Sequence, residues 1–482
     1  MFKKILYSNF TRNVYEKIKG YPFVKQLIVP LANRHSLNYL ENTKNKLDRI
    51  GPGFCSAKWL QSTLHLEIGE THSCHHPKRH AVDFELLDAN PGRLHNTLLK
   101  SKLRNEMLNG EKPSECEYCW RVEKTGDYSD RFYKSSASWA SVDLEKLKSA
   151  EAVNNINPTY LEVSFSSECN LKCAYCYPEV SSSIRREIEK FGPYPTTDQF
   201  QNSEDYKKAI STRDQFTQGK DLSNHFWKWW DGGLCSDLRV LRVTGGEPLL
   251  SKDLFILMDR IAESKTRLDL DFSVNSNLMV GNDTIVKFIS RAKDLVDQNK
   301  IKKFSLYTSI DTWGKHAEYL RFGLNTEKFV NNIETCLKIL PDLELTFMVT
   351  YQALSPFNFN QLLEFILDLR KRFPKGSIKI GISNLLNPSF LSIQVLGPEF
   401  EKYIVSNLEF MKERKLSART PHGFSQFEIQ HLERILHGFK SFPSSWTAQG
   451  KNFQDYFREY DRRKNTSFQS VFGEIPELIK LV

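Results

Sequence analysis

Short hydrophobic, β-branched runs recur through the middle of the chain, and amphipathic stretches separate them. The runs cover 160–165, 238–243, 268–274, 303–310, 343–351 and 377–383. Hydrophobic positions at helical spacing predict helices between the later runs, at 254–264, 284–298, 326–339 and 359–373. Strands that alternate with helices build a parallel sheet with crossover connections. Six such units predict an α/β fold, a partial (β/α)6 TIM-like barrel.

The same pattern divides the chain into units. The barrel is expected over 159–395, with an insertion at 178–237 between its first two strands. The insertion ends in Phe226-Trp227-Lys228-Trp229-Trp230, which could form a lid or a substrate surface, although core packing is the commoner use of clustered tryptophans. A basic helical segment at 1–50 and a small Cys-rich α+β domain at 51–152 precede the barrel, and a helical C-terminal extension follows at 396–482.

Composition narrows the class of protein. With 40% hydrophobic and 26% charged residues in 482, the chain can bury a large core, which excludes disordered and fibrous classes. The net charge of +9 is spread along the chain and does not predict nucleic-acid binding. No stretch approaches the roughly 20 apolar residues of a membrane span, and polar residues interrupt the start of the chain where a secretory signal would be apolar. We therefore expect a cytoplasmic protein.

Three of the nine cysteines lie close together after the first predicted strand. Cys169, Cys173 and Cys176 have C-x3-C-x2-C spacing. Three thiolates on a short loop can hold three corners of a four-iron four-sulfur cube, which leaves one iron open to an outside ligand. Structural zinc loops more often use paired C-x2-C units. The lone Cys235 and Cys336 are predicted to be small hydrophobic residues without a site role.

The segment Cys169-Asn170-Leu171-Lys172-Cys173-Ala174-Tyr175-Cys176 resembles the signature of the radical S-adenosylmethionine (SAM) superfamily. Gly245-Gly246-Glu247-Pro248, after the second strand, resembles that family's glycine-rich motif. The resemblance implies that Tyr175 lies near the adenine ring and that Gly245, Gly246 and Glu247 receive the methionyl ammonium. It also implies that Asn277, or alternatively Asn275, contacts the cofactor. Ser309, at the start of Ser309-Ile310-Asp311, and Arg321 would help to hold the ribose and carboxylate.

The resemblance also implies an activity. Reductive cleavage of SAM at a [4Fe-4S] cluster yields a 5'-deoxyadenosyl radical, which abstracts hydrogen from a substrate carbon. Peptide or protein modification is the first expectation, and a small sugar or nucleotide-type metabolite is the alternative. An electron donor such as flavodoxin or ferredoxin would be needed. An alternative hypothesis from a different functional class is a non-catalytic, zinc-binding interaction protein.

Four more cysteines lie upstream of the barrel, at Cys55, Cys74, Cys116 and Cys119. Alternation over 63–68 and a turn at Gly69-Glu70 predict a hairpin that brings Cys55 toward Cys74, and a helix is predicted over 94–108. The layout resembles a twitch domain, the short form of the SPASM auxiliary-cluster domain, although that domain usually follows the barrel. It implies a second [4Fe-4S] cluster, with structural zinc as the alternative, because spacing alone does not separate the two.

Four histidines surround Cys74 in the sequence, at His72, His75, His76 and His80. They could substitute as metal ligands. A solvated, His-rich turn is the simpler interpretation and the one we predict.

Overall fold

The computed structural model describes residues 38–197 and 200–481. Most of the basic segment predicted over 1–50 therefore lies outside the described residues, and its described part is helical from 38 to 50. How the chain divides into units stays a prediction.

All six predicted barrel strands are present and form a continuous parallel sheet. Each lies beside its neighbour in the order β4, β6, β7, β8, β10, β11. Their bounds are β4 (Tyr160–Ser164), β6 (Val240–Thr244), β7 (Asp271–Ser276), β8 (Lys303–Ser309), β10 (Glu344–Tyr351) and β11 (Ser377–Asn384). The predicted partial barrel is confirmed.

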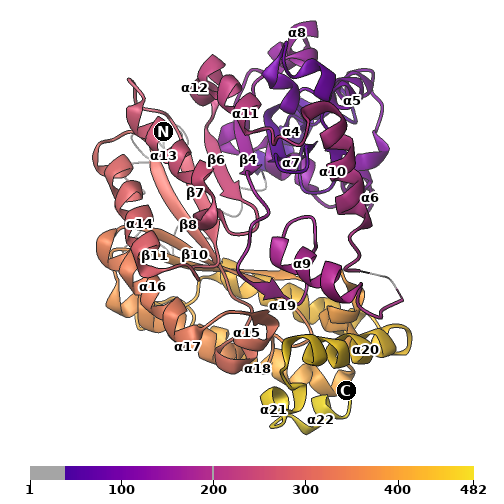
Figure 1. The fold of residues 1–482 in the computed structure, drawn as a ribbon, viewed down its shortest axis with the longest axis vertical. Helices are drawn as coiled ribbons and strands as arrows, with labels where there is room; N and C mark the ends of the chain where they lie inside the picture. Colours follow the sequence, from indigo (N-terminus) through magenta and orange to yellow (C-terminus); the bar gives the residue numbers. More distant parts are fainter. Residues whose placement is uncertain (1–37, 198–199, 482) are drawn as a thin grey trace.

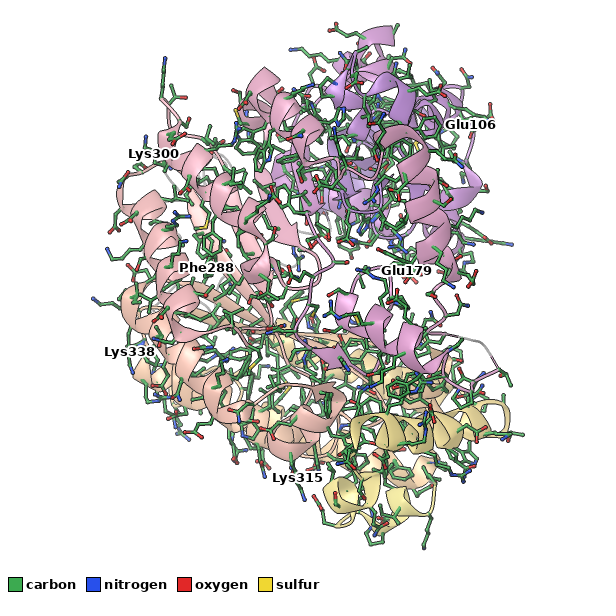
Figure 2. All side chains as sticks on the ribbon, in the orientation of Figure 1. Glu106, Glu179, Phe288, Lys300, Lys315 and Lys338 are labelled. Carbon is green, nitrogen blue, oxygen red and sulfur yellow. The ribbon has the colours of Figure 1, made fainter. Side chains whose placement is uncertain are left out.

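Four crossover helices cover the outer face of this sheet (Figure 1). They are α13 (Lys252–Glu263), α14 (Asn282–Asp297), α16 (Thr326–Ile339) and α17 (Phe359–Arg372), each within two residues of its predicted bounds. Phe288 is fully buried, and its ring centroid lies 5.8 Å from that of Phe304 on β8 (Figure 2). Cys336 is fully buried in α16, as predicted.

Polar residues face the inside of the sheet. Along β10 burial alternates strictly, with Leu345, Phe347 and Val349 buried and Glu344 and Thr346 half-buried. Period-two alternation sends successive side chains to opposite faces. The apolar set therefore lies under the helices and the polar set faces the concave side.

The predicted upstream hairpin is present, and it joins the barrel sheet. β1 (Gln61–His65) pairs antiparallel with β2 (Glu70–His72) and parallel with β4, and β3 (His80–Ala81) completes nine strands. The upstream helices are α4 (Ala57–Leu60), α5 (Leu98–Leu108), α6 (Glu117–Lys124), α7 (Asp130–Ser135) and α8 (Ala150–Asn154). The helix predicted from 94 begins only at Leu98, because Thr97 is extended and its hydroxyl caps the Lys100 N–H.

The insertion forms α9 (Ser182–Phe191), α10 (Glu204–Thr217), α11 (Ser223–Trp229) and the short α12 (Cys235–Asp237). Phe226, Trp229 and Trp230 are buried in the main core. The prediction that this aromatic cluster serves core packing is confirmed.

The C-terminal extension is helical, as predicted, and lies beside the lower end of the barrel (Figure 1). It contains α18 (Glu401–Glu413), α19 (Gln426–Ser441), α20 (Trp446–Lys464), α21 (Phe468–Phe472) and α22 (Pro476–Ile479). Lys315 and Lys338 lie at the outer edge of the molecule (Figure 2). Lys315 forms an ion pair with Glu474, and Lys338 forms one with Glu334. In the part of the chain that the structure describes, no helix has the length and apolar character to cross a membrane.

Candidate active site

The cysteine loop follows β4 and is held by a short sheet of its own. β5 (Lys172–Cys173) pairs antiparallel with β9 (Arg321–Phe322), which places Cys173 opposite Arg321. Burial, reinforced by the neighbouring Cys169 and Asp311, raises the pKa of the Cys173 thiol to about 11 despite the opposing effect of Arg321. Burial and both neighbouring cysteines raise the pKa of Cys176 further. Such thiols become thiolates at neutral pH only when they bind a cation such as a metal.

The two glycines of the Gly-Gly-Glu-Pro turn permit close contact with this loop. Gly246 donates its N–H to the Ser166 carbonyl at 3.2 Å, and Glu247 donates to the Glu168 carbonyl at 2.7 Å. A β-carbon on Gly246 would lie 2.3 Å from the Glu168 oxygen, and Gly245 has a φ of +129°. Glycine is therefore required at both positions to bring the end of β6 against the start of the cysteine loop.

Glu247 is 2% exposed, and its carboxylate is bound at the end of β7. It accepts hydrogen bonds from the Ser276 hydroxyl at 2.7 Å and the Asn277 N–H at 2.6 Å. Burial raises the pKa of Glu247 to about 7, although these hydrogen bonds oppose the shift. The carboxylate is thus poised to change charge near neutral pH.

The two candidate asparagines, one on β7 and one in the loop after it, have different hydrogen-bond partners. Asn277 donates to the Asn170 side chain in the cysteine loop at 2.8 Å. Asn275 instead accepts a hydrogen bond from the Arg242 Nε at 3.0 Å on the inner face of the barrel. The structure therefore brings Asn277 to the cysteine loop and leaves Asn275 with Arg242.

Tyr175, Asp311 and Arg321 form one buried network beside the cysteine loop. The Tyr175 hydroxyl donates to Asp311 at 2.9 Å, and Arg321 donates to the Tyr175 oxygen at 2.6 Å and pairs with Asp311 at 3.3 Å. The Arg321 Nε is buried without a hydrogen-bond partner among the described residues. Ser309 is half-buried at the end of β8, opposite Met348 of β10.

Two buried side chains that sequence reasoning missed hold the carbonyls of the cysteine loop. Gln201, from the insertion, donates to the Cys176 carbonyl at 2.7 Å. Tyr456, from α20, donates its hydroxyl hydrogen to the Ala174 carbonyl at 2.5 Å. In the sequence, Tyr456, Tyr460 and Lys464 recur at helical spacing. That spacing predicts one helix face but not which segment the face contacts.

Glu67, just beyond β1, connects the upstream region to the same loop. It accepts hydrogen bonds from the Ser167 N–H at 2.5 Å and the Ser167 hydroxyl at 2.8 Å. Arg185 of α9 lies 3.5 Å from the same carboxylate. Glu179, only three residues after Cys176, lies on the side of the loop that faces the upstream region (Figure 2). The upstream region is thus fixed against the start of the cysteine loop.

The four upstream cysteines converge on one cavity. Cys55, Cys74, Cys116 and Cys119 line it together with Lys58 and Ser73. Burial raises the pKa of the Cys116 thiol to about 12 and that of Cys119 to about 11, and proximity to Cys55 adds to both shifts. The hairpin thus brings Cys55 and Cys74 together as predicted, and α6 with the turn before it supplies the other pair.

The surroundings of these cysteines suit a metal–sulfur group. The hydroxyls of Ser56 and Ser73, adjacent in sequence to Cys55 and Cys74, are buried without hydrogen-bond partners among the described residues. Hydroxyls in such positions can donate to cluster or cysteine sulfur. Across 38–197 and 200–481, no group of three or more His, Cys, Asp or Glu side chains is arranged to hold a single metal ion. The fit therefore rests on the four thiols and the unpaired hydroxyls.

The predicted solvated histidine turn is only partly exposed. His72 and His76 are half-buried and contact the Cys74 carbonyl at 2.6 Å and Asp130 at 2.9 Å. His80 contacts the Thr97 hydroxyl at 2.9 Å, and only His75 is exposed. The turn packs between β2 and the upstream helices, which shields these three rings from water only in part.

No protein-family model matches the chain. Curated relatives include GTP 3',8-cyclase of Campylobacter lari, 26% identical over 207 residues, which are 43% of this chain and 51% of the relative. GTP 3',8-cyclase of Aliarcobacter butzleri is 26% identical over 208 residues, with the same coverage. The chain spans about half the length of the curated relatives it matches. Over that part the chain is similar to these GTP 3',8-cyclases, which are radical SAM enzymes.

Two solved structures resemble parts of the chain. Streptococcus suis SuiB bound to S-adenosylmethionine has a TM-score of 0.35 and 14% identity, over 74% of this chain and 69% of SuiB. The anSMEcpe enzyme with bound AdoMet has a TM-score of 0.33 and 18% identity, over 52% of this chain and 61% of its own.

Proposed function

We propose that this protein cleaves SAM reductively at a [4Fe-4S] cluster held by Cys169, Cys173 and Cys176. The observation that carries the proposal is the buried three-cysteine loop, which lies against Glu247 and Arg321 at the carboxyl ends of the barrel strands. When bound, the cluster and SAM supply a 5'-deoxyadenosyl radical that abstracts hydrogen from a substrate carbon. The buried donor set, three soft thiols and no local fourth, suits a cluster with one open iron.

The surrounding residues bind and orient the cofactor. Glu247, ionised, would pair with the methionyl ammonium through a charge-assisted hydrogen bond. Arg321 would offer its unpaired Nε to the carboxylate or ribose, while its contacts with Tyr175 and Asp311 fix the guanidinium. Asn277, already bonded to Asn170 in the loop, is the better candidate than Asn275 for a cofactor contact.

We assign Cys55, Cys74, Cys116 and Cys119 to a second [4Fe-4S] cluster that exchanges electrons during turnover. Four thiols on one cavity and the unpaired Ser56 and Ser73 hydroxyls support this assignment. An electron donor such as flavodoxin or ferredoxin would reduce the barrel cluster. Reduced cysteines in these numbers suit a cytoplasmic location.

The substrate proposed first is a peptide or protein side chain. A nucleotide-type metabolite is the second candidate, and the similarity to GTP 3',8-cyclases favours it over other small molecules. Formation of 5'-deoxyadenosine by the reduced protein, measured with a peptide mixture and separately with purine nucleotides, compares the two. Deuterium transferred from the true substrate into 5'-deoxyadenosine would identify it.

Replacement of the three barrel cysteines by alanine tests the proposed chemistry. We expect the C169A/C173A/C176A variant to lose about four irons per chain and all 5'-deoxyadenosine formation, and to keep about four irons at the upstream site. Retention of both barrel iron and cleavage would reject the barrel site. About one zinc and no iron in the folded variant would make the upstream site a structural zinc centre.

A further inference from the structure

Two positive side chains, Lys58 and Lys100, are buried close to the upstream cysteines, and a third, Arg104, is buried against the backbone of Lys58. Lys58 is 3% exposed, and Lys100 and Arg104 are fully buried. Lys58 lines the cavity itself. Lys100 and Arg104 lie on the inner face of α5, beneath β1 and β2. Burial of charged groups is costly unless opposite charge is close by, so this cluster requires an explanation.

In the described part of the chain, a carboxylate pairs with only one of these three side chains. Lys58 pairs with Glu115, but Lys100 donates only to neutral hydroxyls, to Ser62 at 3.1 Å and to Thr71 at 2.9 Å. Arg104 donates to the Lys58 and Val153 carbonyls and the Asn96 amide oxygen, at 2.8–3.1 Å, and its Nη2 lies 3.0 Å from His95 Nε2. Within 38–197 and 200–481, neither Lys100 nor Arg104 forms an ion pair.

The cysteines are the remaining source of negative charge. The charge of Lys58 interacts with those of Cys116 and Cys74, and the charge of Lys100 interacts with that of Cys74. Burial, with Arg104 and Lys58, holds the pKa of Lys100 well below its ordinary value, and Glu115 and Cys74 oppose that shift. A net negative centre in the cavity would oppose it in the same way and favour the charged form of Lys100. Four thiolates carry more negative charge than an iron–sulfur core cancels, so the complete centre is a net anion and becomes more negative when reduced.

We propose that Lys58 and Lys100 are the built-in counter-charge of an anionic tetrathiolate iron–sulfur centre, and that they raise its reduction potential. The proposal rests on the second cluster assigned above. Buried cations stabilise the reduced centre more than the oxidised one, because the reduced centre carries the larger negative charge. The upstream centre is thereby suited to accept an electron, and the two lysines act on its charge without binding the iron themselves.

The test compares neutral variants of Lys100 in the full chain. Lys100→Gln removes the charge and keeps a donor for Ser62 and Thr71, and Lys100→Met removes both. Lys102→Met, on the exposed side of the same helix, is the matched control, since that side chain is 73% exposed. Iron is counted, and both clusters are titrated potentiometrically with detection by electron paramagnetic resonance. Added SAM shifts the barrel signal and so separates the two.

We expect Lys100→Gln to keep its iron and to shift the upstream midpoint to a more negative potential. At the wild-type midpoint the ratio of reduced to oxidised upstream centre should fall several-fold, while the barrel cluster and Lys102→Met stay unchanged. An upstream potential in Lys100→Gln equal to that of Lys102→Met, with iron retained, overturns the inference. If neither Lys100 variant folds, Lys58→Gln gives the same comparison. Wild-type protein without upstream iron would instead reject the second cluster itself.

Discussion

The hydroxyl of Tyr456 lies 2.5 Å from the carbonyl oxygen of Ala174, 282 positions earlier in the chain. Tyr456 belongs to the C-terminal helix α20, and Ala174 lies between the second and third cysteines of the barrel loop. Both are buried. The C-terminal extension therefore packs against the back of the cysteine loop.

Replacement of Tyr456 by phenylalanine should destabilise the protein by about 1–3 kcal/mol, because the Ala174 carbonyl would remain buried without a donor. Chemical denaturation of the anaerobic protein measures the change. Tyr133→Phe is the control, since Tyr133 is 51% exposed. Equal stability of the two variants would show that the hydrogen bond contributes nothing.

Replacement of Gly246 by alanine should prevent close approach of the glycine turn to the cysteine loop. The new β-carbon would meet backbone oxygens of Glu168 at 2.3 Å and Ser167 at 2.4 Å, whereas at Gly281 nothing lies within 4 Å. We expect at least the roughly 1–3 kcal/mol typical of overpacking and loss of barrel iron. Iron content and thermal unfolding of Gly246→Ala and Gly281→Ala should differ clearly; a Gly246→Ala protein that matches its control contradicts the geometry.

Binding of SAM should strengthen as pH rises through about 7, where buried Glu247 loses its proton. The unfolded chain titrates near 4.5, so Glu247 takes up a proton on folding between these values. Its contribution to stability is therefore present below pH 4.5 and lost as pH rises through about 7.

Calorimetric titration with SAM at several pH values checks this dependence. Glu247→Gln should bind about 1.5–3 kcal/mol more weakly well above pH 7 and should show no rise across it. Glu168→Gln, an exposed change in the same loop, should keep the wild-type profile. The same rise in Glu247→Gln would assign the titration to another group.

The buried pair of Lys464 and Glu187 should contribute to stability mainly because each charge is costly alone. Both side chains are 1% exposed, and Lys464 contacts both carboxylate oxygens at 2.8 Å. We expect Lys464→Met to cost about 3–5 kcal/mol and Lys464→Met with Glu187→Met to cost much less. Lys451→Met, 80% exposed, is the control. Additive costs in urea unfolding would mean that the two charges do not interact.

The sequence predicted the residues of each site better than it predicted which distant segments contact one another. The three-cysteine loop, the Gly-Gly-Glu-Pro turn and the upstream hairpin were all visible as local patterns, and the structure places them as neighbours. Parallel pairing of β1 with β4 was not predicted, because alternation reveals that a segment is a strand but not which strand lies beside it. The partial burial of the histidine turn was not predicted for a related reason, since polar composition does not show what packs over it.

Local sequence by itself determined the strands, the helices and the residue types of both cysteine sites, because periodicity and ligand spacing act over a few residues. Only the tertiary structure decided that Gln201 and Tyr456 hold the cysteine loop and that Glu67 fixes the upstream region against it. It also decided that Lys58 and Lys100 are buried close to the upstream cysteines. Those contacts join segments up to 282 positions apart. Their free energies depend on burial and on the absence of competing water, which no local pattern records.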